Sequence, residues 1–237
     1  MTAEALREQV REANAALVTA GLVALSFGNA SGVDRAAGVM FIKPSGVPYD
    51  SLRADDLVAV DLRTGASEDG AARPSSDSPT HLALYRRYPE IGGVVHTHSP
   101  WASTWAQAGR SIPCFGTTHA DHFRGPIPVT RPLREAELGV SYEADTGAVI
   151  IETLDGLALA PLDMPAVLVR SHGPFTFGAD ALDAVANAIA LEAVAAMAYR
   201  TLALDPAGGP ISEALLERHF RRKHGPGAYY GQRDRDG

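Results

Sequence analysis

Residues 91–98 read Ile-Gly-Gly-Val-Val-His-Thr-His, an apolar run that leads directly into two histidines. A continuous apolar run of this kind is typical of a buried strand at the centre of a sheet. Side chains two residues apart on a strand point to the same face, so His96 and His98 are expected to project together. One histidine alone is more often a hydrogen-bonded or surface residue. The pair at strand spacing favours a metal site instead.

A third histidine follows a second apolar strand, predicted over residues 165–170. Pairing of the two strands would bring His172 beside His96 and His98. Three imidazole ligands leave a coordination position open, which is typical of a catalytic metal site. Asp77 stands directly before a predicted helix. A helix cap and a fourth metal ligand are about equally good explanations of that carboxylate.

The surrounding sequence predicts short strands and amphipathic helices. Apolar residues at alternating steps of four and three predict a first helix over residues 6–17, which Gly21 ends. The alanine-rich helix that begins after Asp180 is apolar nearly all round, so we expect it to be buried. Further helices are expected over residues 79–88, 101–108 and 212–224, and strands over residues 39–42 and 57–61.

The composition is that of one globular domain. The chain has 237 residues, of which 46% are hydrophobic, and a formal net charge of −7. A domain of this size folds without a structural metal, so any metal would be functional. The acidic balance argues against nucleic acid as a partner. A single cysteine and a polar N-terminus predict a cytoplasmic protein. Polar residues interrupt the most apolar segment, residues 181–199, so no membrane association is expected.

Several small, hydroxyl and amide residues together predict a phosphate cradle. Each alone is weak evidence, because glycines often serve turns and serines often cap helices. Hydroxyls and unpaired N–H groups at a helix N-terminus nevertheless suit an anion. The candidates are Gly28, Asn29, Lys43, Ser45, Gly46, Ser75 and Ser76.

A candidate acid/base group lies in residues 116–123, Gly-Thr-Thr-His-Ala-Asp-His-Phe. Asp121 stands there among hydroxyls and histidines, after an expected strand. The alternative is an Asx turn, the commoner role of aspartate in a loop. The basic run at residues 218–224 is interpreted as cations at the end of a helix rather than a nucleic-acid patch.

Taken together, these motifs resemble the class II aldolase family, and within it most closely the L-ribulose-5-phosphate 4-epimerase branch. The resemblance runs from Leu6 to Gln232 and implies one domain over residues 1–232, followed by a flexible tail at residues 233–237. It rests on the segments SFGNASGVDR, IKPSGVPYD, RPSSDSPTHLALYRRYP, IGGVVHTHSPWASTWAQAGRSIP, GTTHADHFRGPIPVTR, VLVRSHGPF and RKHGPGAYYGQ.

The resemblance implies a fold and a set of site residues. The fold is α/β, with a central, mainly antiparallel sheet flanked by helices. The candidate substrate residues match phosphate and sugar contacts, with Lys43 nearby, and Asp121 with Tyr230 matches an acid/base pair supported by His219. The resemblance also implies a cyclic homotetramer with active sites at subunit interfaces. One divalent metal per subunit, usually zinc, would be held by Asp77, His96, His98 and His172.

The implied reaction is epimerisation at carbon 4 of a pentulose 5-phosphate, from L-ribulose 5-phosphate to D-xylulose 5-phosphate, in arabinose or ascorbate breakdown. Carbon 4 bears no acidic proton, so the carbon skeleton must open by a retro-aldol step and close again. The alternatives are a class II sugar-phosphate aldolase, which commonly has glutamate in place of Asp77, and a non-catalytic adducin-head-like interaction domain. His122 and Arg124 replace tyrosines expected in the family, which is predicted to alter sugar preference.

Overall fold

A six-stranded sheet in the order β3-β2-β1-β4-β6-β5 forms the centre of the structure. The computed structural model describes residues 2–67, 72–157 and 159–231. Every neighbouring pair of strands is antiparallel, which confirms the expected sheet. The strands are β1 (Asn29–Asp34), β2 (Val39–Ile42), β3 (Val58–Asp61), β4 (Gly93–His96), β5 (Ala166–Leu168) and β6 (Pro174–Gly178).

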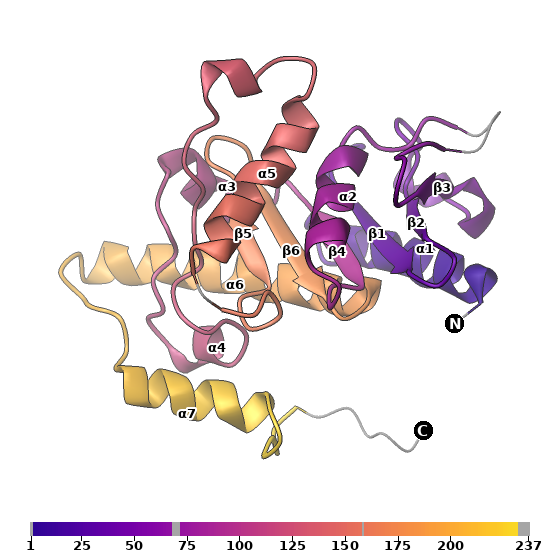
Figure 1. Cartoon of the computed structure of the whole chain (residues 1–237). Helices are drawn as coiled ribbons and strands as arrows, with labels where there is room; N and C mark the ends of the chain where they lie inside the picture. Colours follow the sequence, from indigo (N-terminus) through magenta and orange to yellow (C-terminus); the bar gives the residue numbers. More distant parts are fainter. Residues whose placement is uncertain (1, 68–71, 158, 232–237) are drawn as a thin grey trace.

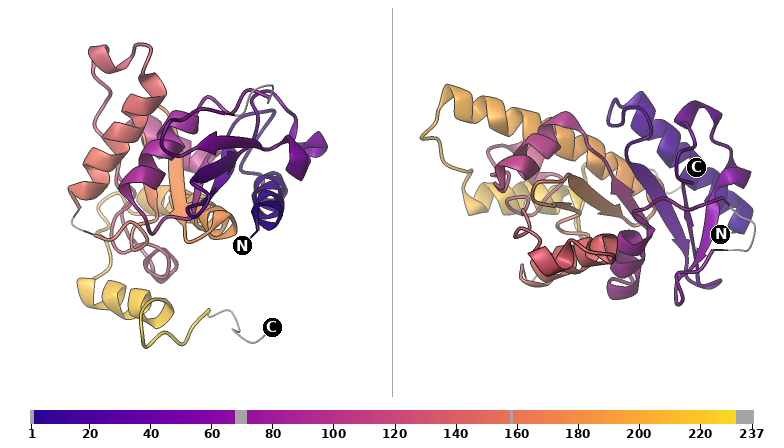
Figure 2. Two further views of the ribbon diagram at one scale, coloured as in Figure 1. Left: turned by 45° about the vertical axis from the view of Figure 1, so that its right-hand side comes forward. Right: turned by 90° about the horizontal axis from the view of Figure 1, so that it is seen from above.

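Helices cover both faces of this sheet (Figures 1 and 2). On one face α2 and α5 pack together, and on the other lie α1 and α6. The helices are α1 (Ala3–Thr19), α2 (Ser78–Arg87), α3 (Pro100–Ala108), α4 (Thr117–Ala120), α5 (Tyr142–Asp155), α6 (Ala181–Leu204) and α7 (Glu213–Lys223), with 3-10 turns η1 (Tyr49–Ser51), η2 (Ala54–Asp56) and η3 (Glu135–Glu137). The expected α/β fold is therefore confirmed.

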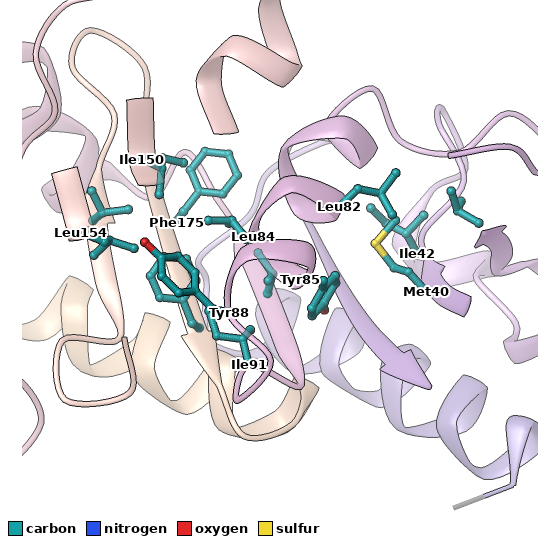
Figure 3. Close-up of a cluster of buried hydrophobic side chains, with 14 of the residues drawn as sticks. Met40, Ile42, Leu82, Leu84, Tyr85, Tyr88, Ile91, Ile150, Leu154 and Phe175 are labelled. Carbon is teal, nitrogen blue, oxygen red and sulfur yellow. The ribbon is translucent and has the colours of Figure 1, made fainter. Parts of the chain in front are cut away.

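The central strand β4 is buried on both faces, as its apolar sequence predicts. Val94 packs in the core beneath α2 and α5, and Val95 packs in the core beneath α1 and α6. Figure 3 shows part of the first core, with Phe175 near Ile150 and Leu84. Alternate side chains thus enter opposite cores, because the period of a strand is two. Phe175 of β6 lies in the first of these cores and is fully buried. Truncating such a ring to alanine would cost about 3–5 kcal/mol of stability.

Helix α6 is long and apolar enough to span a membrane by composition alone, and half of its most apolar window is buried. Its polar side chains bond to the protein's own backbone. The Asn187 side chain donates to the carbonyl of Phe177 at 2.8 Å, and the Glu192 carboxylate accepts from the first N–H groups of α3. Helix α6 therefore contributes to the core, and the Glu192 carboxylate caps α3.

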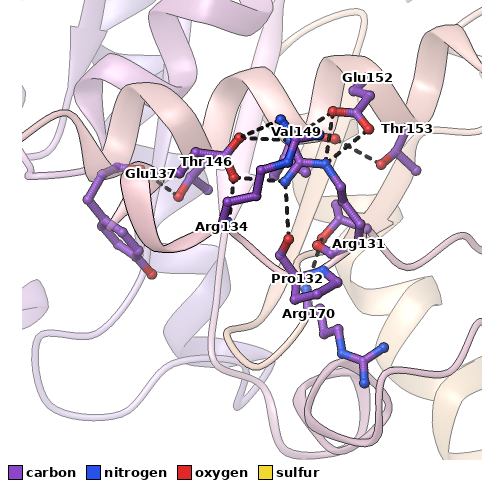
Figure 4. A network of polar contacts seen from close by, with 11 residues as sticks. Arg131, Pro132, Arg134, Glu137, Thr146, Val149, Glu152, Thr153 and Arg170 are labelled. Atoms are coloured by element: carbon purple, nitrogen blue, oxygen red, sulfur yellow. Dashed lines mark hydrogen bonds and ion pairs between the residues drawn. The ribbon is translucent and has the colours of Figure 1, made fainter. Parts of the chain in front are cut away.

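An ion-pair network fixes the segment that leads into α5 (Figure 4). The Arg131 guanidinium contacts the carboxylates of Glu137 and Glu152 at 2.7 and 2.9 Å. Since Glu152 lies on α5, these bonds tie residues 131–137 to the side of that helix. The network thereby fixes the segment that precedes α5 against the C-terminal part of that helix.

The structure differs from the sequence-based expectation in four places. The expected strand before Asp121 is wrong: the helix α4 precedes this residue, and Ile112 pairs with Ile127 only in an isolated bridge. Strands β1 and β6 and helix α5 were not expected at all. The residues of β1, Asn-Ala-Ser-Gly-Val-Asp, are too small and polar to indicate a strand. The predicted tail at residues 233–237 lies outside the described residues.

Candidate metal centre and substrate pocket

Three imidazoles meet at one end of the sheet. His96 is the last residue of β4, His98 follows two residues later, and His172 lies in the turn between β5 and β6. Their ligating nitrogens all lie within 4.8 Å of one another. The expected gathering of the three rings is therefore observed. The strand argument is only partly right, because β4 ends at His96 and His98 reaches the cluster from the following segment.

The ring of His96 has a defined orientation and charge. Its Nδ1 lies 2.9 Å from the carbonyl oxygen of Pro174, so Nδ1 carries the proton and the Nε2 lone pair faces His98. Burial lowers the pKa of His96 to about 3, although the nearby Asp77 carboxylate acts to raise it. The lowered pKa keeps the ring neutral. Neutral imidazole held by a backbone carbonyl is the form that binds metals.

The spacing of the nitrogens suits a metal ion. The Nε2 atoms of His96 and His98 are 3.1 Å apart. Two nitrogens bound tetrahedrally to one zinc ion at about 2.0–2.1 Å lie about 3.3 Å from each other. Because Nδ1 of His96 donates a hydrogen bond to Pro174, its Nε2 lone pair is available to a ligand, and the spacing of the two Nε2 atoms fits joint binding of one cation.

A tight turn presents the third imidazole. Ser171 has a positive φ of 62°, and its N–H donates to the carbonyl of Ala106 at 3.0 Å. A Cβ on Gly173 would approach the carbonyl oxygen of Thr97 to 2.7 Å, so only glycine fits there. Burial, with a contribution from His98, lowers the pKa of His172. The Tyr142 hydroxyl lies 3.4 Å from its Nδ1.

Asp77 stands at the N-cap position of α2, yet among the described residues its carboxylate makes no capping hydrogen bond. Oδ2 instead accepts a hydrogen bond from Nδ2 of Asn29 at 2.6 Å. Burial raises the pKa of Asp77. The neighbouring imidazoles and the Asn29 amide lower it by more than burial raises it, so the net shift of the pKa is downward. The sequence offered two explanations of this carboxylate, a helix cap and a metal ligand. The described part of the chain shows no side-chain cap.

One cavity of about 350 Å³ joins these four residues to all seven candidate substrate residues. Its volume lies in the range of small-molecule sites. Asn29 Oδ1 is a buried polar atom without a hydrogen-bond partner in the described structure. Buried polar atoms are nearly always satisfied, so this atom is available to a bound molecule. The sequence reasoning missed other residues that line the cavity: Ser26, Phe27, Pro44, Tyr142 and Glu143.

The candidate acid/base residues form a separate cluster. Asp121, at the end of α4, accepts hydrogen bonds from Arg222 at 2.5 and 2.8 Å and from His219 at 3.1 Å. The Tyr230 ring lies 4.1 Å from the Arg222 guanidinium. Burial raises the pKa of Asp121, but the bonds to Arg222 and His219 outweigh it, so the pKa is lowered. Within the described chain, none of these four residues lines the cavity.

The two departures from the expected family pattern both bind α7. Arg124 pairs with Glu217 at 2.9 Å and with Asp163 at 3.2 Å. Nε2 of His122 lies 3.0 Å from Nζ of Lys223. Sequence reasoning interpreted the basic residues of α7 as cations at a helix end, and missed that Arg222 holds Asp121. Only the fold brings these residues together, since about 100 positions separate them.

Comparisons with known proteins agree with this architecture. Residues 8–199 match the family model described as the class II aldolase and adducin N-terminal domain. An L-ribulose-5-phosphate 4-epimerase UlaF from Salmonella paratyphi C (strain RKS4594) is 54% identical over 96% of this chain and 99% of that protein.

Solved structures share the fold at lower identity. An L-fuculose 1-phosphate aldolase aligns with a TM-score of 0.74 and 21% identity, over 92% of this chain and 95% of its own. L-fuculose-1-phosphate aldolase from Thermus thermophilus aligns with a TM-score of 0.67 and 23% identity, over 87% of this chain and 100% of its own. The chain therefore belongs to the class II aldolase and adducin N-terminal domain family.

Proposed function

We propose that this protein is a metal-dependent L-ribulose-5-phosphate 4-epimerase that forms D-xylulose 5-phosphate. One observation carries the proposal: three imidazoles and a carboxylate open into the same cavity as a set of candidate anion-binding residues. The 54% identity to a protein named L-ribulose-5-phosphate 4-epimerase supports the choice of substrate.

The substrate's chemistry explains why such a site is needed. Carbon 4 carries no acidic proton, so its configuration is inverted by breaking and remaking the bond between carbons 3 and 4. We infer that His96, His98, His172 and Asp77 hold a divalent ion, zinc by preference, because neutral nitrogen donors with one carboxylate suit that metal. When bound, the ion supplies Lewis acidity that stabilises negative charge developing on the substrate oxygens.

The phosphate end of the substrate needs its own site. We assign it to Ser45, Gly46, Ser75 and Ser76, with Lys43, Gly28 and Asn29 in the same cavity wall. Ser75 and Ser76 lie just before the N-terminus of α2, where the helix dipole favours an anion. Held there, the aldehyde fragment remains bound while its carbonyl turns to present the other face for re-addition.

Proton transfer at the carbon-4 hydroxyl is assigned to Asp121 and Tyr230, one for each stereoisomer, with His219 in support. The lowered pKa of Asp121 keeps this carboxylate ionised, as a base requires. Since these residues lie outside the cavity of their own chain, we infer that a neighbouring subunit supplies them to it. A cyclic homotetramer would place each acid/base cluster against the next subunit's metal site.

The direct test is to incubate the zinc-loaded protein with L-ribulose 5-phosphate and identify the products. Formation of D-xylulose 5-phosphate without net release of cleavage fragments would support the proposal. Accumulation of two fragments alone would favour a sugar-phosphate aldolase. A folded protein that binds no metal and converts no substrate would favour a non-catalytic interaction domain.

A further inference from the structure

Lys43 is a buried cation with an unusual environment. Its side chain is 2% exposed and lines the cavity, directly after the end of β2. Within residues 2–67, 72–157 and 159–231 it forms no ion pair, and the only hydrogen bond of its ammonium is to the carbonyl of Pro44, at 3.4 Å. Charged groups are rarely buried without a partner. Burial accordingly lowers the pKa of Lys43.

The face of Tyr49 provides the remaining contact. Nζ of Lys43 lies 4.8 Å from the centre of the Tyr49 ring, which is within the range of a cation–π interaction. An aromatic face attracts an ammonium group without neutralising it. A carboxylate in the same place would form an ion pair and compete with any bound anion, whereas the ring leaves the charge available.

The hydroxyl of Tyr49 makes a second connection, to the loop that precedes β1. It lies 2.9 Å from the carbonyl oxygen of Phe27 and 2.7 Å from that of Gly28. Both residues line the cavity. Gly28 has a positive φ of 79°, and a Cβ there would lie 2.7 Å from the carbonyl oxygen of His96. The loop held by Tyr49 therefore rests directly on the strand end that carries the first imidazole.

We propose that Tyr49 is a positioning residue for the anionic end of the substrate: its ring holds the Lys43 ammonium at the cavity wall, and its hydroxyl fixes the adjoining loop. The inference rests on the proposed function for the identity of the substrate, but not for the binding of an anion. Tyr49 itself does not line the cavity and touches no reacting atom, so it acts through Lys43 and the loop.

Two substitutions separate the roles of the ring and the hydroxyl. Tyr49→Leu removes both, and it is expected to raise the dissociation constant for inorganic phosphate and the KM for L-ribulose 5-phosphate by about fivefold to tenfold, with kcat changed less than about twofold. Tyr49→Phe retains the ring and loses only the hydroxyl that fixes the loop, so it should raise the phosphate dissociation constant by about twofold to threefold, less than Tyr49→Leu does. Tyr88→Phe, which removes a hydroxyl bound to Asp155 beyond the far end of α2, is the control and should leave phosphate binding unchanged.

A double-mutant cycle with Lys43→Met distinguishes positioning from a general structural effect. Because the ring acts through Lys43 and the hydroxyl through the loop, Tyr49→Leu should have a smaller effect on phosphate binding in the Lys43→Met background, no larger than that of Tyr49→Phe in the wild-type background. Equal loss of affinity in both backgrounds, or unchanged affinity in folded Tyr49→Leu, would overturn the inference. Wild-type protein that binds phosphate with the expected variant pattern but does not epimerise the pentulose would refute the proposed function alone.

Discussion

Nδ2 of Asn29 donates a 2.6 Å hydrogen bond to Oδ2 of Asp77, and Asn29 also lies opposite His96 in the pairing of β1 with β4. One residue thus bonds to the carboxylate through its side chain and pairs through its backbone with the residue that carries the first imidazole. Residues that orient metal ligands in this way commonly contribute one to two orders of magnitude to metal affinity.

Replacing Asn29 by alanine should therefore weaken zinc binding by about 10-fold to 100-fold, because the Asp77 carboxylate loses its fixed orientation. Competition with a chelator measures this affinity. Asn187→Ala is the matched control, since that amide on α6 bonds to the carbonyl of Phe177 and its loss should affect stability only. Unchanged zinc affinity in folded Asn29→Ala would contradict the role of this hydrogen bond.

Asp121→Asn and Tyr230→Phe should each lower the epimerisation rate by about 10²-fold to 10⁴-fold, as expected for loss of a general acid or base. Zinc content should remain that of the wild-type protein, because neither residue lies in the metal pocket. Steady-state rates and metal analysis on the same samples give both values. Wild-type turnover in either variant would refute the assignment of that residue.

Mixing two inactive variants tests whether the site is shared between subunits. In a co-assembled mixture of His96→Asn and Asp121→Asn chains, a metal pocket from one chain meets an intact Asp121 from the other. Random association in equal amounts would restore about one quarter of the sites, and hence about one quarter of wild-type activity. If each chain supplied its own acid/base group, the mixture would remain as inactive as its components.

The buried His119 should make the fold sensitive to mild acid. Burial lowers its pKa to about 4, while its Nε2 lies 2.8 Å from the carbonyl of Gly125. The unfolded chain, with a histidine pKa near 6.5, therefore binds a proton first as the pH falls. The stability that the neutral ring contributes is present above about pH 6.5 and is lost on the way down to about pH 4.

Between about pH 7 and about pH 5 this loss amounts to about 2 kcal/mol for His119 alone. Urea unfolding of metal-free wild-type protein and His119→Gln at the two pH values measures it. Relative to His119→Gln, the free energy of unfolding of the wild-type protein should be about 2 kcal/mol lower at about pH 5 than at about pH 7. A pH-independent difference would show that folding does not lower the pKa of His119.

Sequence reasoning predicted the gathering of the three histidines, because its signals are local. The run from Ile91 into His96 and His98 indicated a buried strand with two ligands, and His172 follows a second apolar strand. All seven residues expected to bind the substrate line the same cavity. Strand β1 was missed because its small polar residues do not alternate, although burial on both faces makes it a strand in this context.

Contacts between distant segments were less predictable. Tyr49 lies in a 3-10 turn, and only the fold brings its ring over Lys43 and its hydroxyl to the loop before β1. Arg222 was interpreted as a cation at the end of a helix, but it holds Asp121 across about 100 residues of sequence. Neither pairing follows a helical or strand period, so no local pattern could reveal it.

Anomalous X-ray scattering at the zinc edge, from crystals of the zinc-loaded protein, examines the metal site without reference to activity. We expect one peak per chain, within bonding distance of His96, His98, His172 and Asp77, at about 2.0–2.2 Å. A peak bound elsewhere, or no peak between these three imidazoles in a folded zinc-loaded protein, would contradict the proposed metal centre and the carbon–carbon cleavage that depends on it.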